Sequence, residues 1–501
     1  MDEIMRIITD ETQDYHQKKS SLAAAAENVL SYPDLSPEAG EYLELKIICD
    51  LNEGHAPYRP RYILPDYRSL MRQGSEYLNL KAPRDLWEAV NALLISYRFV
   101  PSITGYPVYL GQIDELLEPF AAEASDRELE KLLRMYLVQV DRTLPDAFVH
   151  LNIGPADTRT GRMILQLERE LQQAVPNLSL KYDAGTTSPE FAQLAVATAL
   201  EVGKPYFVNH PELRNVWGES YGIASCYNTL KIGGGSYTLV RLNLKEVARH
   251  SDGYQDFWER QLSQAVRLQC EIINRRIRFI VETAKFFESS FLARERLIDR
   301  GNFTAMAGVF GLYEAVEILG GGRMGCEPRA DEMAVAITGR MAELLRSHPG
   351  AYCEGSAGRI GFHAQSGIDS DIDVTAGVRI KIGAEPALFD QLKLAGRLHP
   401  FFDTGISDIT IFDETARRNP EGVRRIIDGA MKSGVRIMAV NTNDSEMVRI
   451  TGYLVKRTDI DRYWQGKPLR EDTVKLGAES IKNNRTLDRR VRQVATEASV
   501  Q

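Results

Sequence analysis

The stretch LSLKYDAGTTSPEFAQLAVATALEVGKPYFVNH, residues 178–210, alternates between two kinds of apolar pattern. LSLKYD (178–183) places its apolar side chains on one face of an extended segment, as a β-strand does. SPEFAQLAVATALEVG (188–203) has the length and apolar content of a helix, and PYFVNH (205–210) is a second short apolar run. Strand, helix and strand in this order are typical of an α/β fold.

The same alternation of short apolar runs and helical segments continues on both sides of this unit. Further strand candidates are AFVHLNI (147–153), YTLVRLNL (237–244), VTAGVRIKI (374–382), DITIFD (408–413) and VRIMAVNT (435–442). Apolar residues at helical spacing predict one long helix from about 254 to 300. The sequence favours one large α/β barrel surrounded by helices, because no linker divides this region.

Three segments of this fold can be distinguished. Residues 1–145 read as a mostly helical N-terminal layer of the same fold, because helical segments dominate there. Residues 146–435 form the predicted barrel core, and residues 436–501 form a C-terminal segment with a polar end.

Composition and charge exclude several classes of function. The chain has 501 residues, 44% of them hydrophobic, and a formal net charge of −8, which argues against a nucleic-acid-binding protein. We expect no membrane span and no signal peptide, and therefore a cytoplasmic protein. The five cysteines include no CxxC pair, so we expect reduced thiols and no metal site.

Common catalytic motifs are missing from the sequence. There is no HExxH pair, no GxSxG elbow and no Walker loop, and the GGG triplets at 233–235 and 320–322 lack the spacing of a dinucleotide fingerprint. We interpret both triplets as turns.

Two unusual positions remain, Cys226 and Gly452. Cys226 lies in a small, polar turn (ASCYN) ahead of a strand, whereas Cys270 lies in an apolar helix pattern. Gly452 interrupts the short strand pattern MVRITGYLVK (447–456). Each has a plain structural explanation, a buried inert thiol and a bulge or close-packing glycine.

Glycine also permits a different chemistry at position 452. Its α-carbon carries no side chain, so a radical there can become planar and delocalise into the amide on one side and the carbonyl on the other. A Cβ would crowd this planar centre. Glycine is therefore the backbone position best suited to storing an unpaired electron.

Four segments resemble glycyl radical enzymes. Residues 449–453, RITGY, are similar to the Arg-Val-x-Gly-Tyr signature of that family, with Ile in place of Val. SITGYPVYLGQIDELLEPF (102–120) looks like an N-terminal segment of the pyruvate formate-lyase type, and residues 176–213 resemble the strand–helix–strand unit ahead of the radical cysteine. GGGSYTLVRLNL (233–244) resembles the strand after that cysteine in anaerobic ribonucleotide reductases. The combined pattern is most similar to the YjjI-type branch.

The resemblance implies a fold, a chemistry and a partner. The fold would be the ten-stranded α/β barrel of this family, with the radical loop in residues 436–501. Gly452 would store a radical, installed after translation by a radical-SAM activating enzyme, and Cys226 as a thiyl would abstract hydrogen from a small-molecule substrate. No bound cofactor is expected, and the family implies a homodimer.

The residues around Cys226 depart from the well-known branches. Formate-lyase types carry two adjacent cysteines, but here Ser225 and Tyr227 flank Cys226. Dehydratase types carry Cys-x-Glu, whose carboxylate acts as a base, but here Asn228 stands at that place. A Gly325–Pro328 stretch, GCEP, is superficially similar to the dehydratase turn but lacks the preceding strand–helix–strand unit.

The substrate is not determined by any motif. Candidate substrate contacts are polar residues at predicted strand ends, namely Asn152, Asp183, His210 and Asn228. For each of them a satisfied polar turn residue is an equally good interpretation. Two alternatives stay open, a divergent ribonucleotide-reductase-like enzyme and a barrel that has lost the radical chemistry and acts as a binding protein.

Overall fold

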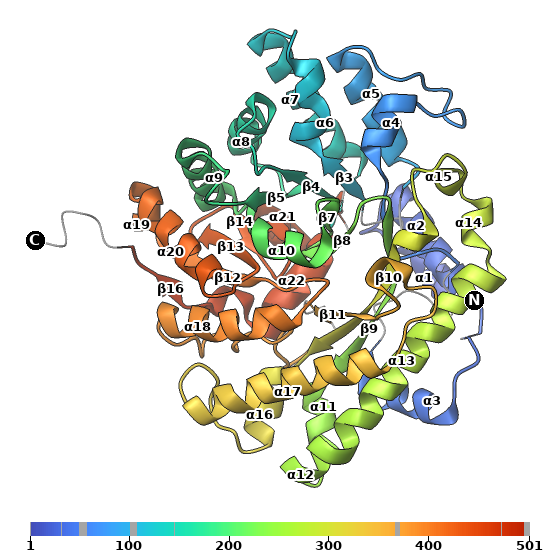
Figure 1. Ribbon diagram of the computed structural model, residues 1–501, viewed down its shortest axis with the longest axis vertical. Coiled ribbons are helices and arrows are strands. Elements are labelled where there is room, and N and C mark those ends of the chain that lie inside the picture. The colour runs from blue at the N-terminus through green and yellow to red at the C-terminus, as the bar shows by residue number, and fades with distance from the viewer. Residues whose placement is uncertain are drawn as a thin grey trace, which may run out of the picture.

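The computed structural model describes residues 2–31, 33–49, 58–100, 108–144, 146–365, 371–471 and 473–494. Strands gather in the middle of the molecule and helices surround them (Figure 1). This arrangement confirms the predicted class, an α/β fold with helices around a central set of strands.

One sheet has seven strands. In sheet order they are β16 (Val491–Arg492), β12 (Asp408–Phe412), β13 (Ile437–Thr442), β6 (Tyr206–Asn209), β5 (Asn177–Tyr182), β4 (His150–Ile153) and β3 (Tyr109–Gln112). Neighbouring strands are parallel except for the antiparallel pair β13 and β6. The strand–helix–strand unit of residues 178–210 supplies two adjacent members of this sheet.

A second sheet has five strands. They are β1 (Ile48–Cys49), β2 (Tyr62–Leu64), β9 (Gly234–Asn243), β10 (Phe303–Phe310) and β11 (Gly361–Ala364). β10 runs parallel to both β9 and β11, whereas β1 and β2 pair antiparallel with β9. Most of the described strands thus belong to these two sheets, and the family's count of ten barrel strands stays a prediction.

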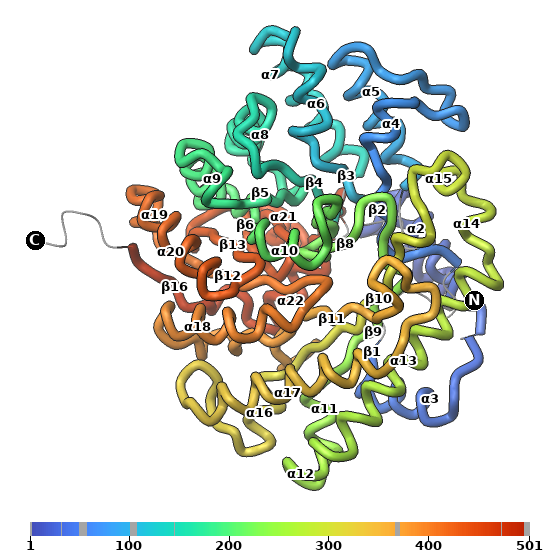
Figure 2. The backbone as a smooth tube through the Cα atoms, viewed as in Figure 1, coloured from blue at the N-terminus to red at the C-terminus, as the bar shows by residue number. Residues whose placement is uncertain are grey.

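Two small hairpins complete the set of strands. One pairs β7 (Tyr221–Ala224) with β8 (Asn228–Lys231), and the other pairs β14 (Met447–Arg449) with β15 (Leu454–Lys456). In Figure 2 the green segment of the first hairpin and the red C-terminal segment meet in the middle of the molecule. This meeting point is where the two unusual sequence positions lie.

Helices form the outer layer. Those before the first hairpin are α1 (Asp2–Thr9), α2 (Tyr15–Glu27), α3 (Pro37–Glu44), α4 (Tyr67–Gln73), α5 (Leu86–Tyr97), α6 (Ile113–Ala121), α7 (Asp126–Thr143), α8 (Arg159–Leu171), α9 (Pro189–Val202) and α10 (His210–Trp217). Those after it are α11 (Leu244–Arg249), α12 (Tyr254–Asp256), α13 (Leu262–Arg278), α14 (Phe286–Ser289), α15 (Phe291–Arg294), α16 (Leu312–Ile318), α17 (Pro328–Ser347), α18 (Leu388–Leu398), α19 (Thr415–Arg418), α20 (Pro420–Lys432), α21 (Arg457–Trp464) and α22 (Thr473–Asn484).

The helix α9 shows why such segments begin and end where they do. The Ser188 side chain accepts a hydrogen bond from the Phe191 amide, and Pro189 occupies the first turn, where its missing N–H is not needed. Gly203 ends the helix in the left-handed conformation, with φ of 70°. The chain then turns directly into β6.

Two sequence predictions about elements were wrong. VTAGVRIKI (374–382) forms no strand but an irregular loop, which Gly377 bends at a φ of 58°. The predicted helix from 254 to 300 is continuous only to about residue 283, with two π-helical turns in it, and Lys285 then breaks it at a φ of 49°.

In the described residues, no helix is long and apolar enough to cross a membrane.

Candidate active site

Cys226 is the middle residue of the turn that joins β7 and β8. Ala224 and Asn228 are paired across the hairpin, so residues 225–227 form the turn, and Ser225 has a φ of 59°. The Cys226 side chain is buried, with 8% of its surface exposed. The hairpin therefore holds a single thiol in the interior of the molecule.

Side chains from β4 fix the backbone of this hairpin. The Asn152 Nδ2 donates to the Ile223 carbonyl at 2.9 Å, and the Ile223 amide donates to the Asn152 Oδ1 at 2.8 Å. His150 Nδ1 contacts the Ser225 carbonyl, and its Nε2 lies 2.8 Å from the Ser179 hydroxyl. Burial lowers the pKa of His150 to about 3, so its imidazole is neutral at pH 7.

Lys181 of β5 supports the first strand of the same hairpin. Its Nζ donates to the Tyr221 carbonyl at 2.7 Å and lies 4.3 Å from the centre of the Tyr221 ring. Burial lowers the pKa of Lys181 to about 8, although nearby carboxylates oppose that shift.

Gly452 lies at the tip of the other hairpin, between β14 and β15. The Ile450 amide donates to the Tyr453 carbonyl at 3.1 Å and closes the turn. Two side chains hold its carbonyls: Asn177 Nδ2 donates to the Gly452 oxygen at 2.8 Å, and Arg489 donates to the Ile450 oxygen at 2.9 Å. The loop is thus bound to β5 and to the C-terminal segment.

Arg449 connects this loop to the end of α9. Its guanidinium donates to the Gly203 carbonyl and lies over the Tyr206 ring, 4.2 Å from the ring centre. A cation over an aromatic face in a dry site is a favourable contact. On the other side of the loop, the Tyr453 ring packs against Phe148, with ring centres 4.9 Å apart.

Gly452 and Cys226 meet directly. A Cβ atom at position 452 would lie 2.0 Å from the Cys226 Cβ, 2.5 Å from its Sγ and 3.0 Å from its Cα. No side chain fits into this space. The two residues, 226 positions apart in the sequence, are therefore in van der Waals contact through the α-carbon of the glycine.

The other cysteines have different surroundings. Cys270 and Cys353 are buried, and burial raises the pKa of each thiol to about 12. Cys326 is exposed in the turn that precedes α17. Cys226 is the cysteine that contacts Gly452.

Comparisons with known proteins match the chain over nearly its whole length. The model of the YjjI-like glycyl radical enzymes covers residues 13–492. The protein YjjI of Escherichia coli (strain K12) is 40% identical over 498 residues, which is 98% of this chain and 96% of that protein. A protein of Haemophilus influenzae is 39% identical over 493 residues, which is 95% of each chain.

The chain belongs to the YjjI-like family of glycyl radical enzymes.

Solved structures place the fold of this YjjI-like enzyme in the same class. A hydroxyproline dehydratase of Clostridioides difficile matches with a TM-score of 0.71 and 10% identity, over 98% of this chain and 88% of the dehydratase. An anaerobic ribonucleotide reductase matches with a TM-score of 0.68 and 10% identity, over 88% of this chain and 83% of the reductase. At such identities the similarity is one of fold, and dehydratases and reductases share it.

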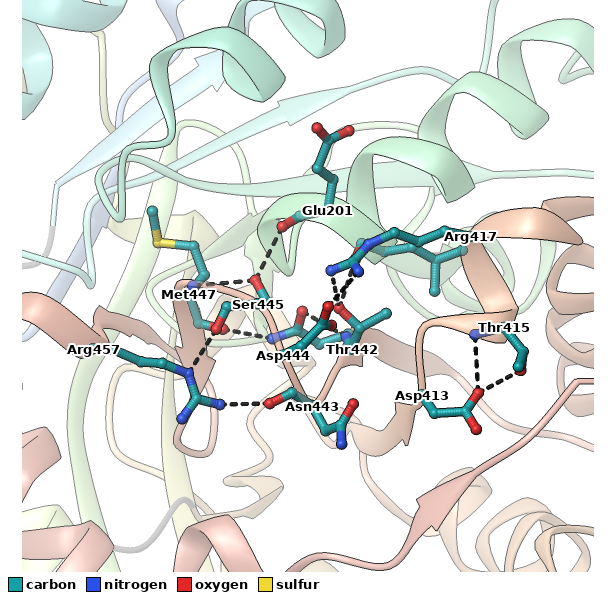
Figure 3. Close-up of polar contacts among 12 residues, drawn as sticks. Glu201, Asp413, Thr415, Arg417, Thr442, Asn443, Asp444, Ser445, Met447 and Arg457 are labelled. Atoms are coloured by element: carbon teal, nitrogen blue, oxygen red, sulfur yellow. Dashed lines mark hydrogen bonds and ion pairs between the residues drawn. The ribbon is translucent and has the colours of Figure 1, made fainter.

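A network of polar contacts anchors the turn that leads into the Gly452 hairpin of this enzyme (Figure 3). Arg457 donates to the Ser445 carbonyl at 2.8 Å and to the Asn443 carbonyl at 2.7 Å. The Ser445 hydroxyl donates to the Glu201 carbonyl at the end of α9, at 3.0 Å. Arg417 of α19 forms an ion pair with Asp444 at 2.6 Å, so the turn is fixed from both sides.

The four predicted substrate contacts have different positions. Asn152 and Asn228 lie at the Cys226 hairpin, where Asn228 donates to the Ala224 carbonyl at 2.9 Å. His210 Nδ1 lies 2.8 Å from the Tyr221 hydroxyl, and Asp183 caps a turn through Gly185 and Thr186 at 2.9 and 3.0 Å. Their role in binding a substrate stays a prediction.

Among these four residues, Asn228 has a side-chain oxygen that accepts no hydrogen bond within the described chain. Its Oδ1 is buried and has no hydrogen-bond partner within the described parts of the chain. Asn152, by contrast, uses both amide atoms to hold Ile223. The structure therefore gives Asn152 a positioning role in the hairpin.

Sequence reasoning missed several residues of the site. These are His150, Asn177, Lys181, Tyr206, Arg379, Arg449 and Arg489. Arg449 stands inside the RITGY motif and could have been inferred from it. The others carry no local signal, because only the fold brings them to the two hairpins.

Proposed function

We propose that Gly452 stores a backbone radical and that Cys226, as a thiyl radical, abstracts a hydrogen atom from a small-molecule substrate. The contact between the two residues is the observation that carries this proposal. It leaves no atom between the α-carbon of Gly452 and the side chain of Cys226. Hydrogen-atom transfer needs this kind of direct approach.

The transfer balances without any further reactant. The Gly452 radical takes the hydrogen atom of the Cys226 S–H group, which leaves a C–H bond at Gly452 and a thiyl at Cys226. The thiyl then takes a hydrogen atom from a substrate C–H bond and leaves a substrate radical. Transfer back at the end of the reaction restores the radical at Gly452.

The protein supplies position and exclusion of solvent for these steps. Gly452 and Cys226 are both buried, and Asn177, Asn152 and Arg489 hold the backbone on either side of the contact. A closed, dry site protects a reactive radical from side reactions. His150 is neutral and bonded on both ring nitrogens, so we assign it a positioning role for the Ser225 carbonyl.

The residues beside Cys226 bear on the class of reaction. A second cysteine for acyl transfer is missing from the turn, because Ser225 and Tyr227 flank Cys226. Asn228 cannot take a proton as a glutamate would. Its free amide oxygen suits a hydrogen bond from a substrate hydroxyl or amine.

The proposal includes a partner. Glycyl radical enzymes need a radical-SAM activating enzyme, and a dedicated activase of this class would remove the hydrogen atom from Gly452. We further propose that the enzyme acts as a homodimer, as the family resemblance implies, and that it is cytoplasmic, as the sequence features of its N-terminal residues and its cysteines suggest.

Electron paramagnetic resonance after anaerobic activation tests the proposal. We expect a doublet from the single remaining α-hydrogen of Gly452, and we expect Cys226→Ser to keep the doublet. Cys226→Ser should lose any turnover that wild-type enzyme shows against a metabolite extract followed by NMR. Air should then cut the activated chain at Gly452. A doublet that persists in Gly452→Ala would refute the assignment.

A further inference from the structure

A cavity of about 110 Å³ lies beside the Gly452 loop. Its walls come from the loop after β11, from the end of α22 with the segment that follows it, and from Thr451. The basic residues of its lining are Arg379, Lys381, Arg485 and Arg489. The volume is far above the roughly 10–15 Å³ that a single water molecule needs.

This cavity borders the Gly452 loop, and one of its arginines reaches the turn that holds Cys226. Thr451, which lines it, directly precedes Gly452. The Arg379 guanidinium lies 5.5 Å from the ring centre of Tyr227, which directly follows Cys226. The cavity therefore borders the Gly452 loop at Thr451, and Arg379 connects it to the residue that follows Cys226.

Two arginines of the cavity have unused donor groups. Arg379 donates to the Ser407 carbonyl at 2.9 Å and to its hydroxyl at 2.8 Å, but its Nη1 is shielded from solvent without an acceptor in the described chain. The same holds for Arg489 Nε and for the Thr451 hydroxyl oxygen. An unmet donor of a charged group in the interior costs free energy, so such groups are normally paired.

Four carboxylates lie around these two guanidinium groups, Asp373 and Glu314 in the lining and Glu385 and Asp408 near Arg489. Neither arginine forms an ion pair with any residue that the structure describes. Glu314, which also lines the cavity, accepts hydrogen bonds from the Thr375 amide and hydroxyl at 3.0 and 2.6 Å. Asp408 lies in the same region, but Gln391 and the Ile409 amide already occupy its oxygens.

The charge state of these groups agrees with a positive cavity. Burial, followed by the neighbouring Arg379, lowers the pKa of Arg489 to about 10, so it stays cationic at pH 7. Burial raises the pKa of Asp408, which disfavours its charged form. Glu385 and Asp408 oppose the shift at Arg489, but neither forms an ion pair with it in the described chain, and a positive charge without an ion-paired carboxylate favours an anionic ligand.

We propose that this cavity binds the anionic group of the substrate, a carboxylate or a phosphate, through Arg379 and Arg489. The inference rests on the proposed function, because it assigns the cavity to the substrate of the Cys226 thiyl. The planar fork of an arginine matches the oxygens of either group and can bind them through two hydrogen bonds. The substrate class is then a small organic acid or a phosphate ester.

Anion binding can be measured on the full chain before activation, without knowledge of the substrate. We would follow thermal unfolding against sodium phosphate or sodium acetate, with sodium chloride keeping the ionic strength constant. A ligand that binds only the folded state raises the melting temperature. We expect a rise with phosphate or with acetate, and the active anion then indicates which group the substrate carries.

Three variants separate the site from general charge effects. Arg379→Gln and Arg489→Gln should each lower the affinity for the anion at least tenfold. Arg425→Gln is the control, at an arginine whose side chain is 76% exposed, and it should bind the anion with the affinity of the wild type. Equal melting shifts in all four proteins, or no shift in the wild type, would overturn the proposal. Arg379→Lys and Arg489→Lys keep the charge if the glutamine variants fail to fold, and we expect them to retain part of the affinity.

A second measurement uses only the wild-type protein. Phenylglyoxal modifies arginine side chains, and mass spectrometry locates the modified residues. We expect the binding anion to slow modification of Arg379 and Arg489 but not of Arg425, and equal rates with and without it would contradict the site. A missing glycyl doublet would refute the proposed function while leaving this anion binding intact, so the two failures can be told apart.

Discussion

At position 452 a side chain has no room. The added Cβ would lie 2.0 Å from the Cβ of Cys226, an atom fixed to the backbone of a tight turn. Backbone conformation is not the reason, since the φ of Gly452 lies outside the left-handed range that glycine favours. The lack of space and the proposed radical chemistry thus both require glycine at this position.

The crowding can be tested as a coupling between the two positions. Gly452→Ala should lower the free energy of unfolding by about 1–3 kcal/mol, as overpacking does. Cys226→Gly removes the atoms at 2.0 and 2.5 Å, so in the double variant the nearest atom of residue 226 is its Cα at 3.0 Å. We expect the second change to recover part of the stability lost in the first.

Urea unfolding of the wild type, both single variants and the double variant measures this coupling. Cys226→Ala provides the matched control, because it keeps the Cβ at 2.0 Å and should recover little. Additive effects in the Cys226→Gly double variant would show that the two residues do not touch in solution.

At the scale of elements, a hairpin of two short strands carries the thiol, and β4 holds it. Isolated hairpins of this length are marginally stable in water. Asn152 replaces missing strand partners by binding both backbone groups of Ile223, at 2.9 and 2.8 Å. The position of Cys226 therefore depends on a side chain in another sheet strand.

Loss of Asn152 should expose the thiol. In Asn152→Ala both backbone groups of Ile223 lose a buried partner, which costs about 1–3 kcal/mol. We expect local opening of the hairpin and several-fold faster alkylation of Cys226 by iodoacetamide, followed by mass spectrometry. Asn152→Asp keeps the acceptor for the Ile223 amide, so its rate of Cys226 alkylation should lie between those of the wild type and Asn152→Ala.

The other cysteines serve as internal references in this experiment. Buried Cys270 and Cys353 should stay slow, and exposed Cys326 should react at one rate in all proteins. Faster reaction of all buried thiols would point to global unfolding and would contradict a local role for Asn152.

The elements also show what the sequence can and cannot predict. Short apolar runs located β5, β6, β12 and β13 correctly, because strands that are buried on nearly their whole length are mostly apolar. VTAGVRIKI has the same apolar content but forms a loop, because Gly377 bends it and Arg379 reaches across to Ser407. That contact depends on the fold and leaves no local pattern.

Some residues of the candidate site could be predicted from the sequence and others could not. Gly452 and Cys226 could be named from short motifs that resemble those of glycyl radical enzymes, and the structure brings the two residues together. Asn177 and Arg489 could not, since each contacts the Gly452 loop from a distant part of the chain, at 2.8 and 2.9 Å. Polar residues of this kind resemble any strand end or turn until the fold is known.

At the scale of the whole molecule, buried ionisable groups make stability depend on pH. Asp114, at the start of α6, is fully buried and accepts hydrogen bonds from the Gly154 and Glu115 amides at 2.6 and 2.9 Å. Burial nevertheless raises its pKa from the ordinary value of 3.8 to about 7. The folded protein therefore holds this proton more tightly than the unfolded chain does.

The sign of the effect follows from this pKa. A group whose pKa is raised in the folded state contributes stability that is complete below pH 3.8 and is lost as the pH rises through about 7. We expect Asp114→Asn, which cannot ionise, to lack this contribution. The difference in the free energy of unfolding, wild type minus variant, should be largest near pH 4 and smaller at pH 8, by on the order of 1–4 kcal/mol.

Urea unfolding at a series of pH values measures this difference, with Asp461→Asn as a control at an exposed carboxylate of α21. For this control, the difference in the free energy of unfolding between wild type and variant should stay nearly constant with pH. A constant difference for Asp114→Asn as well would mean that the Asp114 carboxyl ionises as readily in the folded protein as in the unfolded chain. Because the Asp114 carboxyl accepts a hydrogen bond from the Gly154 amide, it joins the start of α6 to the end of β4, the strand whose Asn152 holds the Cys226 hairpin.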